Sequence, residues 1–165
     1  MESLTLEEYN RMRGLGISTL DCRPTFPYSG RHVPGSVSIS INGSFEDMTH
    51  CFFPKKEKLL LISQKERLSE SLLRLENENF ESVSYFDIDL WFEADMECSQ
   101  ISRVDASEAS KYLEKMIDVS NSEDWDVLHV KGVPNVPLVK LIESPEHVKS
   151  GSVLYCGNGH KSMAA

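Results

Sequence analysis

Two stretches of this sequence carry the same residues at the same spacing, 97 positions apart. His32 follows Asp21 by eleven residues, and His129 follows Asp118 by the same interval. A spacing that recurs at several positions is typical of a duplicated structural unit. The repeat therefore predicts that the chain consists of two copies of one fold.

Both copies alternate helix-forming segments with short apolar runs. In the first unit, residues 1–97, we expect helices over 4–13 and 69–77 and strands over 17–20, 36–41, 59–62 and 83–86. In the second unit, residues 98–165, we expect a helix after residue 105 and strands over 133–136 and 153–155. Because buried apolar strands that alternate with helices form parallel sheets, this order predicts an α/β fold: two units, each with a parallel central sheet flanked by helices.

Two of the expected helices begin with the pattern of a capping box. Thr5 precedes Glu8 by three residues, and Asp105 precedes Glu108 by three residues. In a capping box, each side chain accepts a backbone N–H that the first helical turn leaves without a partner. Gly14 is expected to end the first of these helices.

The charge balance excludes several classes of partner. Seventeen Lys and Arg residues against 26 Asp and Glu residues give a net charge of −9, whereas nucleic acids and anionic membranes require a basic surface. No apolar run approaches the roughly 20 residues of a membrane span, and the N-terminus does not resemble a signal peptide. The four cysteines show no paired spacing, so we expect reduced thiols and a cytoplasmic location.

The residues with the clearest chemistry follow the apolar run at 153–155. They form a loop of seven residues that leads into an expected helix: Cys156, Gly157, Asn158, Gly159, His160, Lys161 and Ser162. Glycines allow successive backbone N–H groups to point inward as an anion-binding nest, and a helix N-terminus adds partial positive charge. We therefore predict Cys156 as a reactive nucleophile and the other six residues as its substrate-binding loop.

Two other interpretations of this loop fail on spacing. A Walker A loop requires glycine directly before its Lys-Ser pair, but His160 occupies that position. A zinc site would recruit Cys156 and His160, but the remaining cysteines and histidines do not form ligand-spaced pairs. We expect neither a metal nor a cofactor.

These motifs resemble the rhodanese domain. Asp21 and Arg23, followed by His32 and Gly35, are similar to its Asp-x-Arg strand end and its His-Ile-Pro-Gly-Ala turn. The loop at 156–162 resembles its active-site loop, Cys-x-x-Gly-x-Arg-Ser. The tandem order is most similar to the C-terminal rhodanese pair of bacterial metallo-β-lactamase-fold/rhodanese fusions, although the lactamase-fold domain and its iron are absent from this sequence.

The resemblance implies a sulfurtransferase. The loop cysteine would take sulfane sulfur from a small donor, thiosulfate or a low-molecular-weight persulfide, hold it as a persulfide and pass it to a thiol acceptor. Phosphatases of the same superfamily have a loop one residue longer, so a small phosphatase is a minor alternative. The main alternative is a non-catalytic binding or scaffold module.

Three positions depart from the family pattern. Ser63 stands where the second unit has Cys156, and no glycine follows it, so the first unit is expected to be inactive. Lys161 replaces the arginine of the loop, which keeps the charge but loses bidentate recognition of anions. Ser120 replaces the arginine of the Asp-x-Arg motif.

The remaining conspicuous residues have structural explanations. His32 and His129 are expected to hold the turns that follow them by hydrogen bonds, and Asp21 and Asp118 to anchor loops. Trp91 and Trp125 are expected to be packing residues.

The second unit lacks counterparts of the helix at 69–77 and the strand at 83–86. We therefore expect one of two outcomes: a homodimer, in which a second copy covers the gap, or a disordered loop at 156–162. In either case, sulfur transfer is expected to be slower than in a version of the chain extended to complete the second unit.

Overall fold

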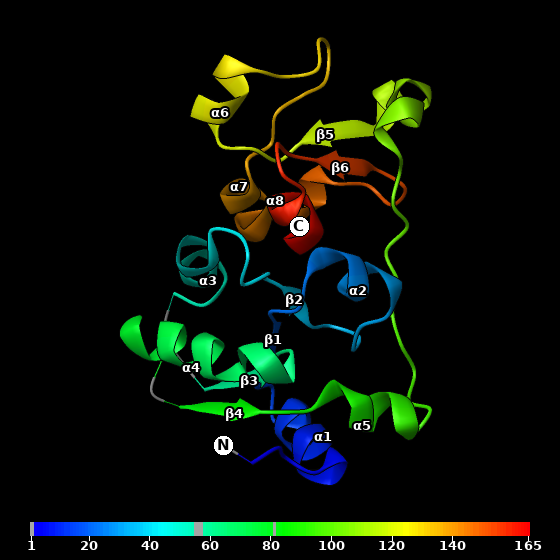
Figure 1. The fold of residues 1–165 in the computed structure, drawn as a ribbon. Coiled ribbons are helices and arrows are strands. Elements are labelled where there is room, and N and C mark those ends of the chain that lie inside the picture. The colour runs from blue at the N-terminus through cyan, green and yellow to red at the C-terminus, as the bar shows by residue number, and fades with distance from the viewer. Residues whose placement is uncertain (1, 55–57, 81) are drawn as a thin grey trace. The chain divides into compact units, whose positions relative to one another are not determined.

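The computed structural model describes residues 2–54, 58–80 and 82–165 (Figure 1). The chain divides into two compact units, Met1–Ile101 and Ser102–Ala165. Among the described residues, no helix has both the length and the apolar character that a bilayer crossing requires.

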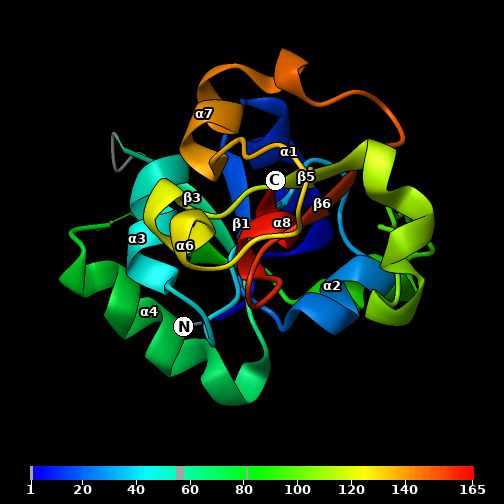
Figure 2. The same cartoon turned by 90° about the horizontal axis from the view of Figure 1, so that it is seen from above.

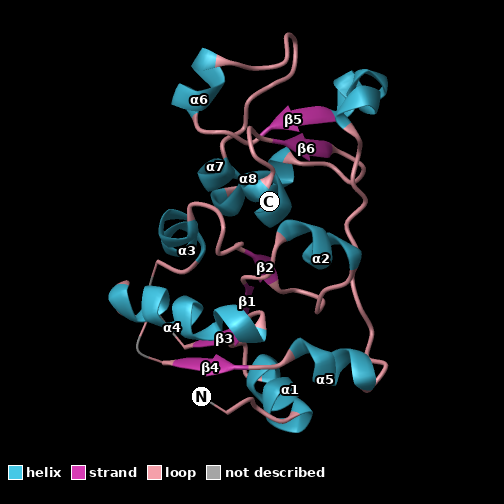
Figure 3. Ribbon diagram, viewed as in Figure 1, coloured by secondary structure: helices cyan, strands magenta, loops and turns pink. Residues whose placement is uncertain are grey.

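A four-stranded parallel sheet forms the centre of the first unit (Figure 3). Its strands are β1 (Ser18–Asp21), β2 (Val37–Ser38), β3 (Leu59–Ile62) and β4 (Val83–Tyr85), in the order β2-β1-β3-β4. All four residues of β3 are buried, and β3 pairs with β1 on one side and with β4 on the other. The predicted parallel sheet and its fully buried strand are confirmed.

Helices cover both faces of this sheet. They are α1 (Leu6–Gly14), α2 (Thr25–Gly30), α3 (Phe45–Phe52), α4 (Leu68–Asn77) and α5 (Ile88–Glu93), with a short 3-10 helix, η1 (Lys65–Arg67). On one face, Leu60 and Ile62 pack with Tyr9 of α1 and Trp91 of α5. Figure 2 shows α3 beside α4, and Glu46 of α3 forms an ion pair with Arg74 of α4 at 2.5 Å.

The capping box at the start of α1 is present as predicted. The Thr5 hydroxyl accepts the backbone N–H of Glu8, and the Glu8 carboxylate accepts the backbone N–H of Thr5 at 2.9 Å. The helix ends at Gly14, and the left-handed residue that turns the chain away is Gly16, with φ +83°.

The strand expected over 36–41 is shorter than predicted. Only Val37–Ser38 forms the strand β2. These two residues pair with the last two residues of β1, which ends at Asp21. Ile39 still donates its N–H to the Asp21 carbonyl, and Ile41 donates to the Cys22 carbonyl. The segment therefore crosses the end of β1 as buried irregular chain.

The second unit is built around two parallel strands, β5 (Met116–Asp118) and β6 (Val153–Tyr155). Its helices are α6 (Ser122–Val127), α7 (Leu138–Glu143) and α8 (His160–Ala164), with the 3-10 helices η2 (Ala106–Lys115) and η3 (Pro145–His147). Ile117, Val119 and Leu141 form its buried apolar cluster, against which Leu154 and Cys156 pack. The strand expected over 133–136 is reduced to one bridge between Asn135 and Asp118.

The capping box expected at Asp105 does not form, and the helix that follows is a 3-10 helix. The Asp105 carboxylate accepts both the N–H and the hydroxyl of Ser107, at 2.8 and 2.6 Å. The Glu108 side chain forms an ion pair with Lys111 instead of returning to the backbone of Asp105. A tight turn at the first residues favours the narrower helix.

Candidate active site

The two units place Ser63 and Cys156 at the same position of their sheets. In the first unit, Asp21 at the end of β1 pairs with Ile62, the residue before Ser63. In the second unit, Asp118 at the end of β5 pairs with Tyr155, the residue before Cys156. Both side chains therefore follow the carboxyl end of a parallel strand, where α/β folds bind their ligands.

Each unit contains the same stacked aromatic pair. The rings of Tyr28 and His32 lie 4.0 Å apart at 11°, and those of Trp125 and His129 lie 3.9 Å apart at 14°. In both pairs the histidine Nδ1–H donates to the carbonyl of the aromatic residue four positions earlier, at 2.9 and 2.7 Å. These side-chain bonds join the histidines to the preceding helices, α2 and α6, and not, as the sequence had led us to expect, to the turns that follow. Trp125 was expected to be a packing residue, and it packs by stacking on His129.

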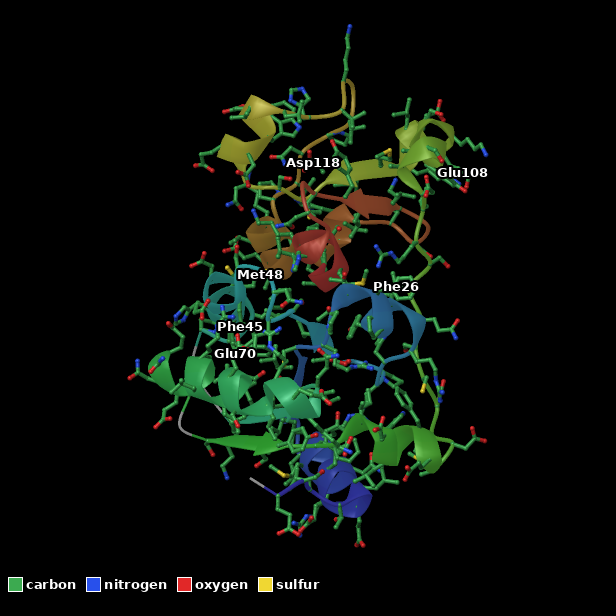
Figure 4. All side chains as sticks on the ribbon, viewed as in Figure 1. Phe26, Phe45, Met48, Glu70, Glu108 and Asp118 are labelled. Carbon is green, nitrogen blue, oxygen red and sulfur yellow. The ribbon has the colours of Figure 1, made fainter. Side chains whose placement is uncertain are left out.

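The buried aspartates anchor the strand ends in two different ways. The Arg23 guanidinium holds the Asp21 carboxylate through contacts of 2.7 to 3.1 Å. Asp118, which is 1% exposed and lies at the end of β5 (Figure 4), accepts the N–H of Ser120 at 2.8 Å. Ser120 is the counterpart of Arg23, and because its side chain carries no charge it cannot form an ion pair with Asp118.

Tyr155 takes part of the role that Arg23 has in the first unit. Burial raises the pKa of Tyr155, and a hydrogen bond with Asp118 also raises it. The Tyr155 hydroxyl accepts the backbone N–H of Val130 at 3.1 Å. The sequence interpretation missed this role of Tyr155. A signal was present: Tyr155 stands where the first unit has Ile62, and Ser120 stands where it has Arg23.

The cysteine loop has a defined geometry. Gly159 has φ +81° and caps α8, so the loop requires glycine there for backbone conformation. Gly157 does not have positive φ, and a Cβ atom at that position would contact nothing within 4 Å. The Cys156 Sγ lies 3.8 Å from Asn158 Oδ1 and 3.7 Å from Ser162 Oγ. The helix predicted after the loop begins at His160.

Two of the predicted anion-binding groups have partners within the unit. The backbone N–H of His160, one of the loop N–H groups, donates to Asn158 Oδ1 at 3.1 Å. The Lys161 ammonium lies 3.2 Å from Asp124 Oδ2 of α6. The sequence could indicate the Asn158 contact, since asparagine often bonds the N–H two residues on, but not the Asp124 contact, which joins separate elements.

Ser63 is held in a buried hydrogen-bonded cluster. Its hydroxyl lies 3.0 Å from the Ser71 hydroxyl, which in turn lies 3.3 Å from Cys22 Sγ. Burial raises the pKa of the Cys22 thiol, so this cysteine is a poor nucleophile. Within the described ranges, His, Cys, Asp and Glu side chains form no group of three or more that could hold a metal ion.

No protein-family profile matches the sequence, and no curated protein matches it. Several solved structures are similar in fold. The rhodanese-like domain of the Alr3790 protein from Anabaena is 21% identical, with a TM-score of 0.52 over 64% of this chain and 86% of that one. The BH2092 protein from Bacillus halodurans is 16% identical, with a TM-score of 0.52 over 66% of this chain and 88% of that one.

A third similar structure is an EanB variant in complex with hercynine. It is 14% identical, with a TM-score of 0.54, and covers 87% of this chain but only 42% of its own. At these identities the similarity shows the fold alone. The chain has an α/β fold of the rhodanese-like type, with a parallel central sheet flanked by helices.

Proposed function

We propose that this protein is a sulfurtransferase that carries sulfane sulfur as a persulfide on Cys156. The observation that carries the proposal is the position of Cys156 directly after β6, at the start of a loop that ends in α8. We further propose that residues 1–97 are an inactive rhodanese-like copy and that residues 98–165 carry the active loop. Ser63 supports this asymmetry, because it holds the register position of Cys156 within a buried serine cluster.

The reaction has two displacement steps. The Cys156 thiolate attacks the sulfane sulfur of a small donor, thiosulfate or a low-molecular-weight persulfide. The donor S–S bond breaks, and sulfite or the donor thiolate leaves with the electron pair. An acceptor thiolate then attacks the outer sulfur of the persulfide, which releases the Cys156 thiolate and forms the acceptor persulfide. The Ser162 hydroxyl, 3.7 Å from Sγ, is placed to donate to the anionic sulfur.

A similar solved structure supports this chemistry on this fold. One EanB structure, 14% identical with a TM-score of 0.52, is described as carrying a cysteine persulfide with ergothioneine. We propose a thiol acceptor of unspecified identity for the present protein, without nucleic acid, metal or cofactor. The four cysteines are free, so we propose a compartment that keeps thiols reduced, such as the cytoplasm.

The test is the mass of the intact protein after incubation with thiosulfate or with a small-molecule persulfide. We expect the gain of one sulfur atom, removable by a thiol such as dithiothreitol, and no gain in Cys156→Ser. Sulfur uptake by Cys156→Ser equal to that of the parent would disprove the site. The same samples, sized in solution, decide whether two copies pair as a homodimer.

The second candidate function is a non-catalytic binding module. The observation that favours it is the engagement of loop groups within the protein, where Asp124 pairs with Lys161 and Asn158 takes the His160 N–H. Absence of sulfur uptake from every donor, in a protein whose loop remains ordered, would favour this candidate over the sulfurtransferase.

A further inference from the structure

Helix α6 places a carboxylate against the only lysine of the cysteine loop. Lys161 Nζ lies 3.2 Å from Asp124 Oδ2, and the Lys161 side chain is 21% exposed while that of Asp124 is 65% exposed. Asp124 lies one residue before Trp125, whose ring is fixed by stacking on His129 at 3.9 Å. The stack joins α6, which carries Asp124, to the turn that follows it.

This ion pair changes the charge that an incoming donor meets. A cation that binds a dianion acts through its net charge, and a carboxylate in contact with it removes most of that charge. Lys161 also lacks the rigid, planar fork with which an arginine binds two oxygens of one anion. The His160 N–H is already bonded to Asn158 Oδ1, so the loop offers an anion fewer donors than its sequence indicates.

We propose that Asp124 sets the donor specificity of the Cys156 loop by neutralising Lys161, so that the site disfavours dianionic thiosulfate and favours hydropersulfides whose remaining group is neutral or positively charged. This inference rests on the proposed sulfurtransferase function. It assigns Asp124 as a specificity-determining residue, acting through Lys161.

The two donor classes differ in the charge that must enter and leave. From a hydropersulfide R–S–S–H, the Cys156 thiolate takes the outer sulfur together with its proton, the S–S bond breaks, and the thiolate RS⁻ leaves. From thiosulfate, a dianion approaches an anionic sulfur, and sulfite leaves carrying two negative charges. Only the second path requires a free cation beside Cys156.

The experiment compares donors of different charge on the full chain. Persulfide formation on Cys156 is followed by intact mass, at equal concentrations of thiosulfate, of cysteamine hydropersulfide and of 3-mercaptopropionate hydropersulfide. The parent should react fastest with the cationic donor and slowest with thiosulfate. Asp124→Asn should raise the thiosulfate rate about two- to fivefold, the range of a single exposed ion pair, and should leave the cysteamine rate nearly unchanged.

The matched control is Asp126→Asn, which removes the same charge from the same helix. Asp126 makes no ion pair in the described part of the chain, so its substitution should change the thiosulfate rate less than about twofold. Added salt should slow thiosulfate in Asp124→Asn, where Lys161 is free, and should have little effect in the parent. A parent that prefers thiosulfate, or equal effects of the two substitutions, would overturn the inference.

A second readout is independent of sulfur transfer. The ratio of Cys156 alkylation rates by anionic iodoacetate and neutral iodoacetamide reports the charge beside the thiol. This ratio should rise about two- to fivefold in Asp124→Asn and stay near the parent value in Asp126→Asn. If the alkylation ratio changes in Asp124→Asn but no donor forms a persulfide, the proposed sulfurtransferase function is rejected, whereas the effect of Asp124 on the charge beside Cys156 is supported. An unchanged ratio would reject the role of Asp124.

Discussion

The hydroxyl of Tyr155 accepts the backbone N–H of Val130 at 3.1 Å, and Tyr155 pairs with Asp118 across the two parallel strands. One side chain thus connects the strand that carries Cys156 to the turn that follows α6. Ile62, the first-unit counterpart, has no hydroxyl, and there Arg23 connects Asp21 to the carbonyl of Arg31 instead.

Tyr155→Phe should loosen the second unit. The substitution leaves the Val130 N–H without its acceptor, which should cost about 0.5–1.5 kcal/mol. Hydrogen exchange reports the two units separately and should show faster exchange in residues 102–165 alone. Tyr112→Phe is the control, since the Tyr112 hydroxyl makes no hydrogen bond in the described part of the chain. Unchanged exchange in both variants would contradict this role.

Cys156 should be the first cysteine to react with iodoacetamide near neutral pH. It is partly exposed and lies beside the Ser162 hydroxyl, whereas Cys22 is 1% exposed and burial raises the pKa of its thiol. Peptide mapping after brief labelling gives the order, with Cys22 expected last. Labelling of Cys51 or Cys98 before Cys156 would argue against an activated loop.

Ser63→Cys should not create a second active site. The new thiol would stay beside Ser71 and Cys22 in a buried cluster, and the segment after it contains no glycine to shape an anion-binding loop. We expect no sulfur uptake by Ser63→Cys combined with Cys156→Ser, measured by intact mass. Uptake in that double variant would show that the strand end suffices without the loop.

The first unit should lose stability at alkaline pH. Burial raises the pKa of Tyr28 to about 12, and its hydroxyl donates to the Ser36 carbonyl at 2.6 Å. Because the folded pKa lies above the unfolded value of about 10, this contribution is complete below pH ~10 and is lost as pH rises through ~12. Denaturant midpoints read by circular dichroism should change little between pH 8 and about 10 and should fall above about pH 10, less steeply in Tyr28→Phe. Tyr9, whose pKa burial also raises to about 12, accounts for part of the remaining slope.

Local signals in the sequence predicted the scaffold well. The fully apolar run at 59–62 identified β3, and the Thr5 and Glu8 pair identified the start of α1. Both depend on residues that are neighbours in sequence or on one face of one element. The capping box at Asp105 was wrong because Ser107, inside the same turn, competes for the carboxylate.

The details of the candidate site were harder to predict. Lys161 and Asp124 are 37 residues apart and come from different helices, so no periodicity connects them. The Tyr155 and Asp118 contact depends on the register of β5 and β6, which fixes which residues face each other only after the sheet has formed. The predicted role of Cys156 and residues 157–162 as a catalytic loop stays a prediction.

The pairing of the strands also sets where the protein opens first. β3 has a hydrogen-bonded strand on each side, whereas β6 pairs with β5 alone among the described residues. A strand with one neighbour, packed on a small apolar cluster, separates at a lower free-energy cost than one held from both sides. A protease should therefore cut first within residues 102–165 and leave the first unit as a resistant fragment, so that the half bearing Cys156 determines the working lifetime of the whole chain.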